Sequence, residues 1–128
     1  MKKLFYILLL PSIMCCSVPK HQINTNDLAS SSTVYDFGKT KKTESLKAVF
    51  IVKNTFNYPI SLYKVTTSCK CVQAHLKKIK LKPNESTSVN VTFNTEGLKG
   101  LQKKVITIEK DNPNNKYLQF YIKTEIID

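Results

Sequence analysis

The sequence predicts an all-β protein built as a single antiparallel β-sandwich of about seven strands. From Thr33 onward, apolar and polar residues alternate with a period of two, and no apolar stripe of helical period appears. Clusters of Asn, Pro and Gly interrupt this alternation at short intervals, as expected for turns between strands. The chain of 128 residues has the length of one domain. Strands with one apolar and one polar face are typical of two packed antiparallel sheets.

The expected strands can be placed from this alternation. In order along the chain they are residues 34–37, 46–53, 60–67, 69–74, 88–93, 105–110 and 117–126. The first is expected to end at Gly38. In the fifth, Val89, Val91 and Phe93 alternate with hydroxyl and amide side chains, which predicts a half-buried strand. Turns are expected at residues 54–59, 82–85, 95–100 and 111–115, where Asn, Pro and Gly gather.

The N-terminus is expected to be an export signal. Lys2 and Lys3 form a short positive segment, and a run of about eleven mostly apolar residues follows, too few to span a membrane. A cysteine directly after such a run resembles the signal of bacterial lipoproteins, in which that cysteine is lipidated. Cys16 is the expected acceptor because Ile13 stands three positions before it and Cys15 directly before it. Cys15 is the alternative acceptor.

This signal predicts three regions and a location. Residues 1–15 are the lipoprotein signal peptide, residues 16–32 are the lipidated cysteine and a flexible Ser- and Asn-rich tether, and residues 33–128 are the β-sandwich domain. Several acyl chains would anchor the protein firmly in the membrane. Because Ser17 rather than an acidic residue follows Cys16, we expect a periplasm-facing protein on the bacterial outer membrane, with the inner membrane as the alternative.

The chain is strongly basic, with a formal net charge of +11, and all of its 20 Lys and Arg residues are Lys. Recognition of phosphates and bases favours the bidentate guanidinium of Arg, so the composition argues against a nucleic-acid partner. Four lysines lie close together in the sequence and are candidate contacts to an anionic surface, either lipid head groups or acidic polysaccharide. They are Lys77, Lys78, Lys80 and Lys82. The alternative is a solvated sheet edge that lysines keep from pairing with other strands.

Cys69, Cys71 and His75 are the candidate metal or redox residues. In an extended strand, Cys69 and Cys71 would face the same side with their Cα atoms about 6.6 Å apart. That distance is near the upper end of disulfide geometry, so a bridge between them would need a bend. Zinc is disfavoured because three ligands fall short of the usual four, whereas two thiolates suit Cu(I). The alternative is a structural role, as packed cysteines or as a fixed disulfide.

Catalytic patterns are scarce in this sequence. His21 and His75 are the two histidines, and His21 lies in the expected tether. The acidic residues are scattered, three glycines are too few for a phosphate-binding loop, and no nucleophile elbow appears. The sequence therefore predicts a protein that is not an enzyme.

Several short segments together resemble a known family. They are Tyr35-Asp36-Phe37-Gly38, Phe50-Ile51-Val52-Lys53-Asn54, Tyr58-Pro59-Ile60, Val65-Thr66-Thr67-Ser68-Cys69-Lys70-Cys71, Leu81-Lys82-Pro83-Asn84-Glu85-Ser86, Val91-Thr92-Phe93 and Gly100. This order resembles the domain of unknown function 1573, a bacterial family that is common in exported lipoproteins of Gram-negative bacteria. Its most specific element is the Ser-Cys-x-Cys motif. The resemblance implies an immunoglobulin-like form of the sandwich and implies no activity.

The chain departs from the family pattern at two positions where the family has Gly. Asn84 tolerates left-handed backbone geometry, so the turn at Pro83 is expected to survive. Lys70 does not tolerate it, so a tight backbone arrangement at the cysteines is not expected.

We therefore expect a cell-envelope lipoprotein that acts as a non-enzymatic binding or scaffolding module without a cofactor. Its expected partners are the membrane, through the lipid anchor, and an envelope protein or glycan. The alternative function is a Cu(I)-binding or thiol–disulfide factor that acts through Cys69 and Cys71. A copper-delivery protein of cytochrome oxidase assembly also carries Cys-x-Cys on an immunoglobulin-like sandwich, which is an analogy only.

Overall fold

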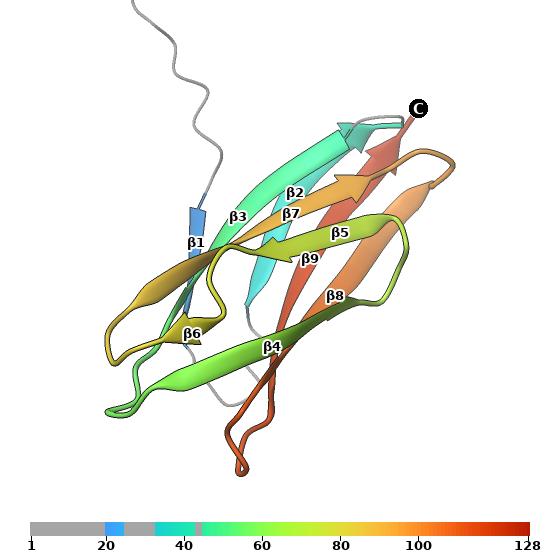
Figure 1. Cartoon of the computed structure of the whole chain (residues 1–128). Coiled ribbons are helices and arrows are strands. Elements are labelled where there is room, and N and C mark those ends of the chain that lie inside the picture. Colours follow the sequence, from blue (N-terminus) through green and yellow to red (C-terminus); the bar gives the residue numbers. More distant parts are fainter. Residues whose placement is uncertain (1–19, 25–32, 43–44) are drawn as a thin grey trace, which may run out of the picture.

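The computed structural model describes residues 20–24, 33–42 and 45–128. These residues form nine strands in two sheets that pack face to face, and none of them lies in a helix (Figure 1). The strands are β1 (Lys20–Asn24), β2 (Val34–Lys41), β3 (Ser45–Lys53), β4 (Ile60–Thr67), β5 (Val72–Leu76), β6 (Lys80–Leu81), β7 (Ser86–Asn94), β8 (Gly100–Lys110) and β9 (Tyr117–Ile127). The predicted all-β sandwich is confirmed, with two short strands, β1 and β6, that the sequence did not predict.

The two sheets have different strand orders. Sheet A has the order β1-β3-β7-β5, and sheet B has the order β2-β9-β8-β4-β6. The inner strands pair antiparallel, as expected for a sandwich. At one edge of each sheet the pairing is parallel instead, since β1 runs parallel to β3 and β2 runs parallel to β9. The prediction of purely antiparallel sheets is therefore wrong at these two edges.

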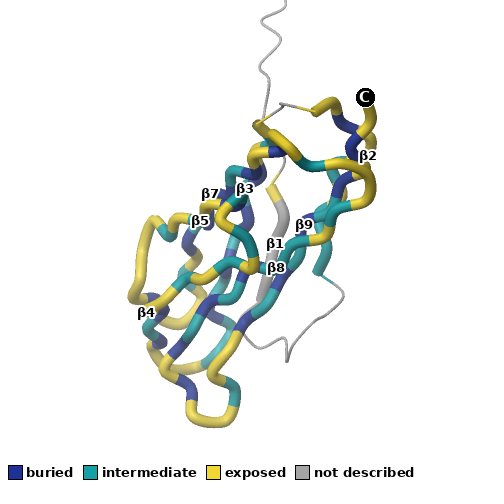
Figure 2. The backbone as a smooth tube through the Cα atoms, turned by 90° about the vertical axis from the view of Figure 1, so that its right-hand side faces the viewer, coloured by how far each residue is buried: buried dark blue, intermediate teal, exposed yellow. Residues whose placement is uncertain are grey.

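The core lies between the sheets and is built from alternate residues of each strand. Phe50 of β3, Phe93 of β7 and Phe120 of β9 are fully buried, and the rings of Phe50 and Phe120 lie 4.3 Å apart. Figure 2 shows buried residues alternating with more exposed ones along the strands. This alternation follows from the pleat, which points successive side chains to opposite faces. Burial of this apolar face is the main stabilising contribution to the fold.

Strand β2 continues past Gly38, where the sequence predicted its end. Gly38 has φ of +72°, and the pairing register with β9 shifts between Asp36 and Lys39. The glycine therefore marks a bulge inside the strand rather than a terminus, because it accepts a backbone conformation that other residues avoid. The strand then runs on to Lys41.

Part of the expected tether also differs. Lys20–Asn24 forms β1 on the edge of sheet A, in register with residues 49–53 of β3. A polar segment can occupy an edge position because the ladder needs only backbone hydrogen bonds. The expected signal peptide and both candidate lipidation residues, Cys15 and Cys16, lie outside the described residues. Among the residues that are described, no helix is long and apolar enough to cross a membrane.

Two asparagines organise the end of the sandwich near β6. Asn84 has φ of +66°, which confirms the expected left-handed turn. Asn54 is fully buried, and its side-chain amide donates hydrogen bonds to the carbonyls of Tyr58, at 2.9 Å, and Leu81, at 3.0 Å. Asn54 therefore links the turn after β3 to the β6 segment.

Candidate functional site

The cysteine pair lies in the turn that carries the chain from sheet B to sheet A. Strand β4 ends at Thr67, and β5 begins at Val72. Cys69 and Cys71 are joined by a disulfide, and their Cα atoms are 5.1 Å apart. The prediction of an extended segment at residues 69–71 is therefore wrong. The turn supplies the bend that a bridge between these two cysteines requires.

Hydrogen bonds fix both ends of this turn. On the sheet B side, the Ser68 amide donates to the carbonyl of Val105 at 3.0 Å, and the Val105 amide donates to Ser68 Oγ at 3.0 Å. On the sheet A side, the Asn94 amide donates to the carbonyl of Cys71 at 2.8 Å. The turn is thus tied to β8 and to β7, which belong to opposite sheets.

The interior of the turn is held by its own backbone and by Thr67. The Val72 amide donates to the carbonyl of Cys69 at 3.1 Å. The hydroxyl of Thr67 lies 2.9 Å from the Cys69 carbonyl and 3.1 Å from the Val72 carbonyl, so these two acceptors share its single O–H proton. Lys70, between the cysteines, is exposed, and its φ is not positive. Among the described residues other than glycine, the one with a positive φ is Asn84. The turn therefore closes without the glycine that the family pattern has there.

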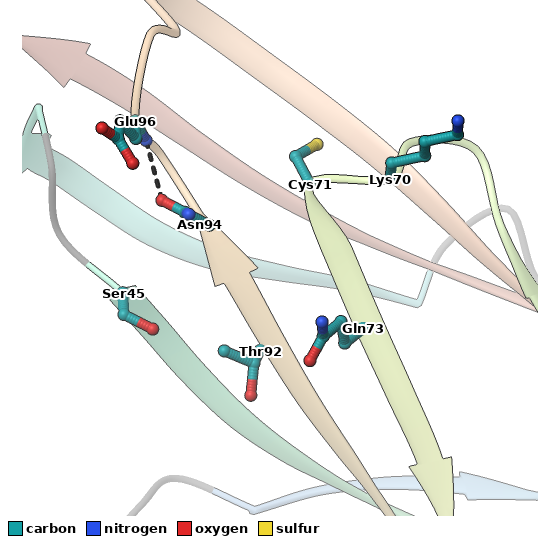
Figure 3. Close-up of a pocket in the computed structure, with 7 residues that line it drawn as sticks. All are labelled: Ser45, Lys70, Cys71, Gln73, Thr92, Asn94 and Glu96. Carbon is teal, nitrogen blue, oxygen red and sulfur yellow. Dashed lines mark hydrogen bonds between the residues drawn. The ribbon is translucent and has the colours of Figure 1, made fainter.

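A hollow of about 590 Å³ lies beside the disulfide on the outer face of sheet A (Figure 3). Three adjacent strands supply its polar lining. Ser45 comes from β3, Thr92 and Asn94 come from β7, and Gln73 comes from β5. Glu96 follows β7, and its amide donates to Asn94 Oδ1 at 2.9 Å. Lys70 and Cys71 complete the rim, so the hollow offers hydroxyl, amide, ammonium and carboxylate groups to a ligand.

The structure does not bring the predicted metal ligands together. His75 is exposed and lies inside β5, opposite Asn90 of β7, roughly 13 Å along the chain from Cys71 at 3.3 Å per residue. The described residues contain no group of three His, Cys, Asp or Glu side chains placed to hold a metal ion. Ligation of Cu(I) by the two sulfurs would first require reduction of the disulfide.

The four clustered lysines line two hollows that share Lys78. Lys77 follows β5, and its amide donates to the carbonyl of Ser88 at 3.0 Å, which brings it to the outer face of sheet A. Lys78 forms an ion pair with Glu85, and the hydrogen bond from this ammonium lowers the pKa of the Glu85 carboxyl. Lys80 and Lys82 flank Leu81 of β6 and, together with Lys78, line a hollow at the edge of sheet B.

One buried cation escaped the sequence prediction. Lys110 at the end of β8 is fully buried, and its Nζ lies 5.6 Å from the centre of the Phe56 ring. Burial lowers the pKa of this ammonium. The alternation along β8 could have indicated this burial, because Lys110 lies two positions after Ile108 and four after Ile106, and therefore faces the same side of the sheet as these buried residues.

The fold and the turn define the class of protein to which this chain belongs. Two packed sheets, with a cysteine pair at the crossing between them, make an immunoglobulin-like β-sandwich domain. The chain belongs to the family described as protein of unknown function (DUF1573), whose model matches residues 28–126. No curated protein matches the sequence.

Solved structures support the same fold. A protein of unknown function from Porphyromonas gingivalis W83 is 24% identical, with a TM-score of 0.64 over 73% of this chain and 44% of that one. The VesB protease of Vibrio cholerae is 15% identical, with a TM-score of 0.63 over 73% of this chain and 30% of the protease. The PapD-like domain 7 of human CEP192 is 12% identical, with a TM-score of 0.57 over 75% of this chain and 82% of that domain. The chain spans less than half the length of the first two proteins.

Proposed function

We propose that this protein is a non-enzymatic binding module of the bacterial cell envelope. The observation that carries the proposal is the polar hollow beside the disulfide turn. Its floor is made by three hydrogen-bonded strands, so the backbone positions that carry the hydroxyl and amide side chains are fixed relative to one another. Groups held by a sheet bind a ligand with little loss of conformational entropy. The disulfide turn adds a fixed wall, because both of its ends are hydrogen-bonded to the sheets.

The chemistry of the hollow fits binding better than catalysis. Its titratable side chains are Lys70 and Glu96, while Cys71 is held in the disulfide. Covalent catalysis needs a nucleophile within hydrogen-bond reach of an activating base. The hydroxyls of Ser45 and Thr92 lie instead among amide side chains, which donate and accept hydrogen bonds but do not take up a proton.

The proposal includes a lipid anchor at Cys16, with Cys15 as the alternative acceptor. The anchor places the domain in the periplasm, and we propose the outer membrane, rather than the inner membrane, as its site. The anchor is supported by the sequence of the first sixteen residues. Globomycin, which blocks the lipoprotein signal peptidase, should accumulate the unprocessed chain. Cys16→Ser should prevent lipidation and leave the chain unprocessed, whereas the Cys15→Ser variant should be lipidated and processed normally. Normal processing and membrane retention of both single variants and of the double variant would contradict the anchor.

Binding is tested by affinity capture of the full chain from detergent-solubilised envelopes. Thr92→Trp places a large ring in the hollow, and Thr66→Trp is the matched control on the outer face of sheet B. We expect a partner, protein or glycan, to be recovered with the wild type and with the Thr66 variant, and to be lost with the Thr92 variant. Recovery that is insensitive to both variants, or no recovery at all, would contradict a binding role for this hollow.

A second candidate function is thiol–disulfide exchange at Cys69 and Cys71. It is favoured by the exposed Lys70 between them, since a neighbouring cation stabilises the thiolate of the reduced form. In such an exchange, a partner thiolate attacks one sulfur, the S–S bond breaks, and the other cysteine leaves as a thiolate. A second thiol of the partner then releases the reduced protein and is itself oxidised to a disulfide. Reduction also frees the two sulfurs for Cu(I), the other form of this candidate.

The two candidates respond differently to loss of the cysteines. The double variant Cys69→Ser/Cys71→Ser should retain partner capture if the protein is a binding module. In the reverse direction of this exchange, the Cys69 thiolate of a single Cys71→Ser variant attacks a partner disulfide and one partner sulfur leaves as a thiolate. The mixed disulfide then persists, because Cys71 is absent and cannot resolve it. Recovery of such an adduct, or stoichiometric Cu(I) on the reduced wild type, together with loss of capture in the double variant, would favour the second candidate.

A further inference from the structure

The hollow beside the disulfide turn is one end of a longer groove. Strand β7 is the third strand of sheet A, between β3 and β5, and its outward residues are all short and polar. Its inward residues, among them Val89, Val91 and Phe93, are buried in the core. The outward set, which forms the groove floor, is Ser86, Ser88, Asn90, Thr92 and Asn94.

Side chains of the neighbouring strands, most of them longer than those of the floor, stand on either side of it. The register places Lys47 of β3 and Gln73 of β5 on opposite sides of Thr92. Two residues earlier in β7, Val49 of β3 and His75 of β5 stand on opposite sides of Asn90. Three hollows of about 590, 540 and 490 Å³ follow one another along β7, each lined by members of the floor. A strand of this length spans roughly 30 Å at 3.3 Å per residue.

The charge along the groove is mainly positive, and Glu96 is the acidic residue in the hollow at its disulfide end. Strands β1, β3, β5 and β7 contain no Asp or Glu, whereas Lys20, Lys47 and Lys77 stand along the face. Glu85 and Glu96 lie beyond the two ends of β7, and Glu85 is paired with Lys78. The strands of sheet B, by contrast, contain three acids, and Lys123, Lys64 and Lys116 form ion pairs with two of them. The three are Asp36, Glu109 and Glu125.

The backbone of β7 cannot recruit a ligand strand, because β3 and β5 already pair with it on both sides. Recognition in the groove must therefore use side chains. Hydroxyl and amide groups donate and accept hydrogen bonds, which suits the hydroxyls of sugars, and the lysines suit carboxylates. We propose that the groove along β7 binds an extended linear polysaccharide that carries carboxylates. This inference names the ligand class for the binding function proposed above and rests on it.

The probe for this proposal is polygalacturonate, a linear polymer of carboxylated sugars, with the neutral polymer dextran for comparison. Titration calorimetry with the full chain in detergent micelles should show binding of the first and not of the second. Lys47→Gln/Lys77→Gln should weaken binding at least tenfold, which corresponds to about 1.4 kcal/mol. The control Lys103→Gln/Lys123→Gln removes the same charge from the outer face of sheet B and should change the affinity less than threefold.

Four results would overturn the proposal. Equal weakening by the two double variants would mean that only net charge matters. Binding of dextran as tight as that of polygalacturonate would remove the role of the carboxylates. Binding of poly-glutamate, but not of polygalacturonate, with the same dependence on Lys47 would identify an acidic peptide as the ligand. Absence of polygalacturonate binding, while Thr92→Trp still abolishes partner capture, would reject the polysaccharide and leave the proposed binding function standing.

Discussion

Removing the disulfide should cost the fold little, and this prediction can be worked from the structure. The perturbation is Cys69→Ser/Cys71→Ser. The bridge joins residues only two positions apart, so it closes a ring of three residues. In the chain-entropy account, a disulfide stabilises the native state by restricting the unfolded chain, and the effect grows with the logarithm of the ring size. A ring this small restricts very little of the chain.

For three residues the chain-entropy relation gives about 1.6 kcal/mol at 25 °C. That value is an upper expectation, since the turn keeps its other restraints in the variant. The backbone hydrogen bonds of Ser68 to Val105 and of Asn94 to Cys71 do not depend on the sulfur atoms. We therefore expect the double variant to lose between zero and about 1.6 kcal/mol of the free energy of unfolding. By comparison, truncation of a buried core ring such as Phe93→Ala should cost about 3–5 kcal/mol.

The assay is urea unfolding of the oxidised wild type, the reduced wild type and the double variant, followed by circular dichroism at 25 °C. The reduced wild type and the double variant should unfold at nearly the same urea concentration, and Phe93→Ala should unfold at a much lower one. A loss above about 3 kcal/mol in the double variant would refute the reasoning. The bridge would then brace the sandwich, and the exchange candidate would lose its basis.

Three other substitutions test the interior. Asn54→Ala should lower the free energy of unfolding by about 2–3 kcal/mol, because buried carbonyls lose their donor; a loss below 0.5 kcal/mol would contradict this. Thr124→Val should cost about 1–2 kcal/mol, because its hydroxyl bonds both Thr40 Oγ1 and the Gly38 carbonyl; an unchanged urea midpoint would speak against it. Lys110→Met removes the desolvation penalty of this ammonium, so its free energy of unfolding relative to that of the wild type should be most favourable near pH 7. The native pKa of Lys110 lies below its ordinary 10.5, so burial opposes folding at neutral pH and does so less as pH rises. The advantage of the Met variant should therefore shrink toward pH 10.5, and an advantage that grew with pH would contradict this sign.

The alternation of apolar and polar residues predicted most of the sandwich because each strand has one buried face. Strand β4 occupies the predicted residues 60–67, and β9 exceeds its prediction by one residue. The left-handed backbone at Asn84 was also predicted correctly, since it is a local property of the turn. These features depend on neighbouring residues in the chain, which a sequence displays directly.

The features that sequence analysis missed depend on pairing between distant residues. The turn at Cys69 and Cys71 is set by bonds to Val105 and Asn94, which lie far away in the chain. Strand β1 has no apolar pattern, because an edge strand held by backbone bonds needs none. The groove along β7 could not be predicted, because it depends on the register that places long side chains of β3 and β5 beside short ones.

The central claim is that the outer face of sheet A is the binding surface of this protein. The most direct measurement is the change in backbone amide NMR signals when isotopically labelled protein is titrated with oligomers of galacturonate. The account predicts that the shifted signals cluster along β7 and the facing parts of β3 and β5, from Ser86 to Asn94, with little change in β8 and β9. Shifts centred on the outer face of sheet B, or scattered over exposed lysines of both sheets, would contradict it.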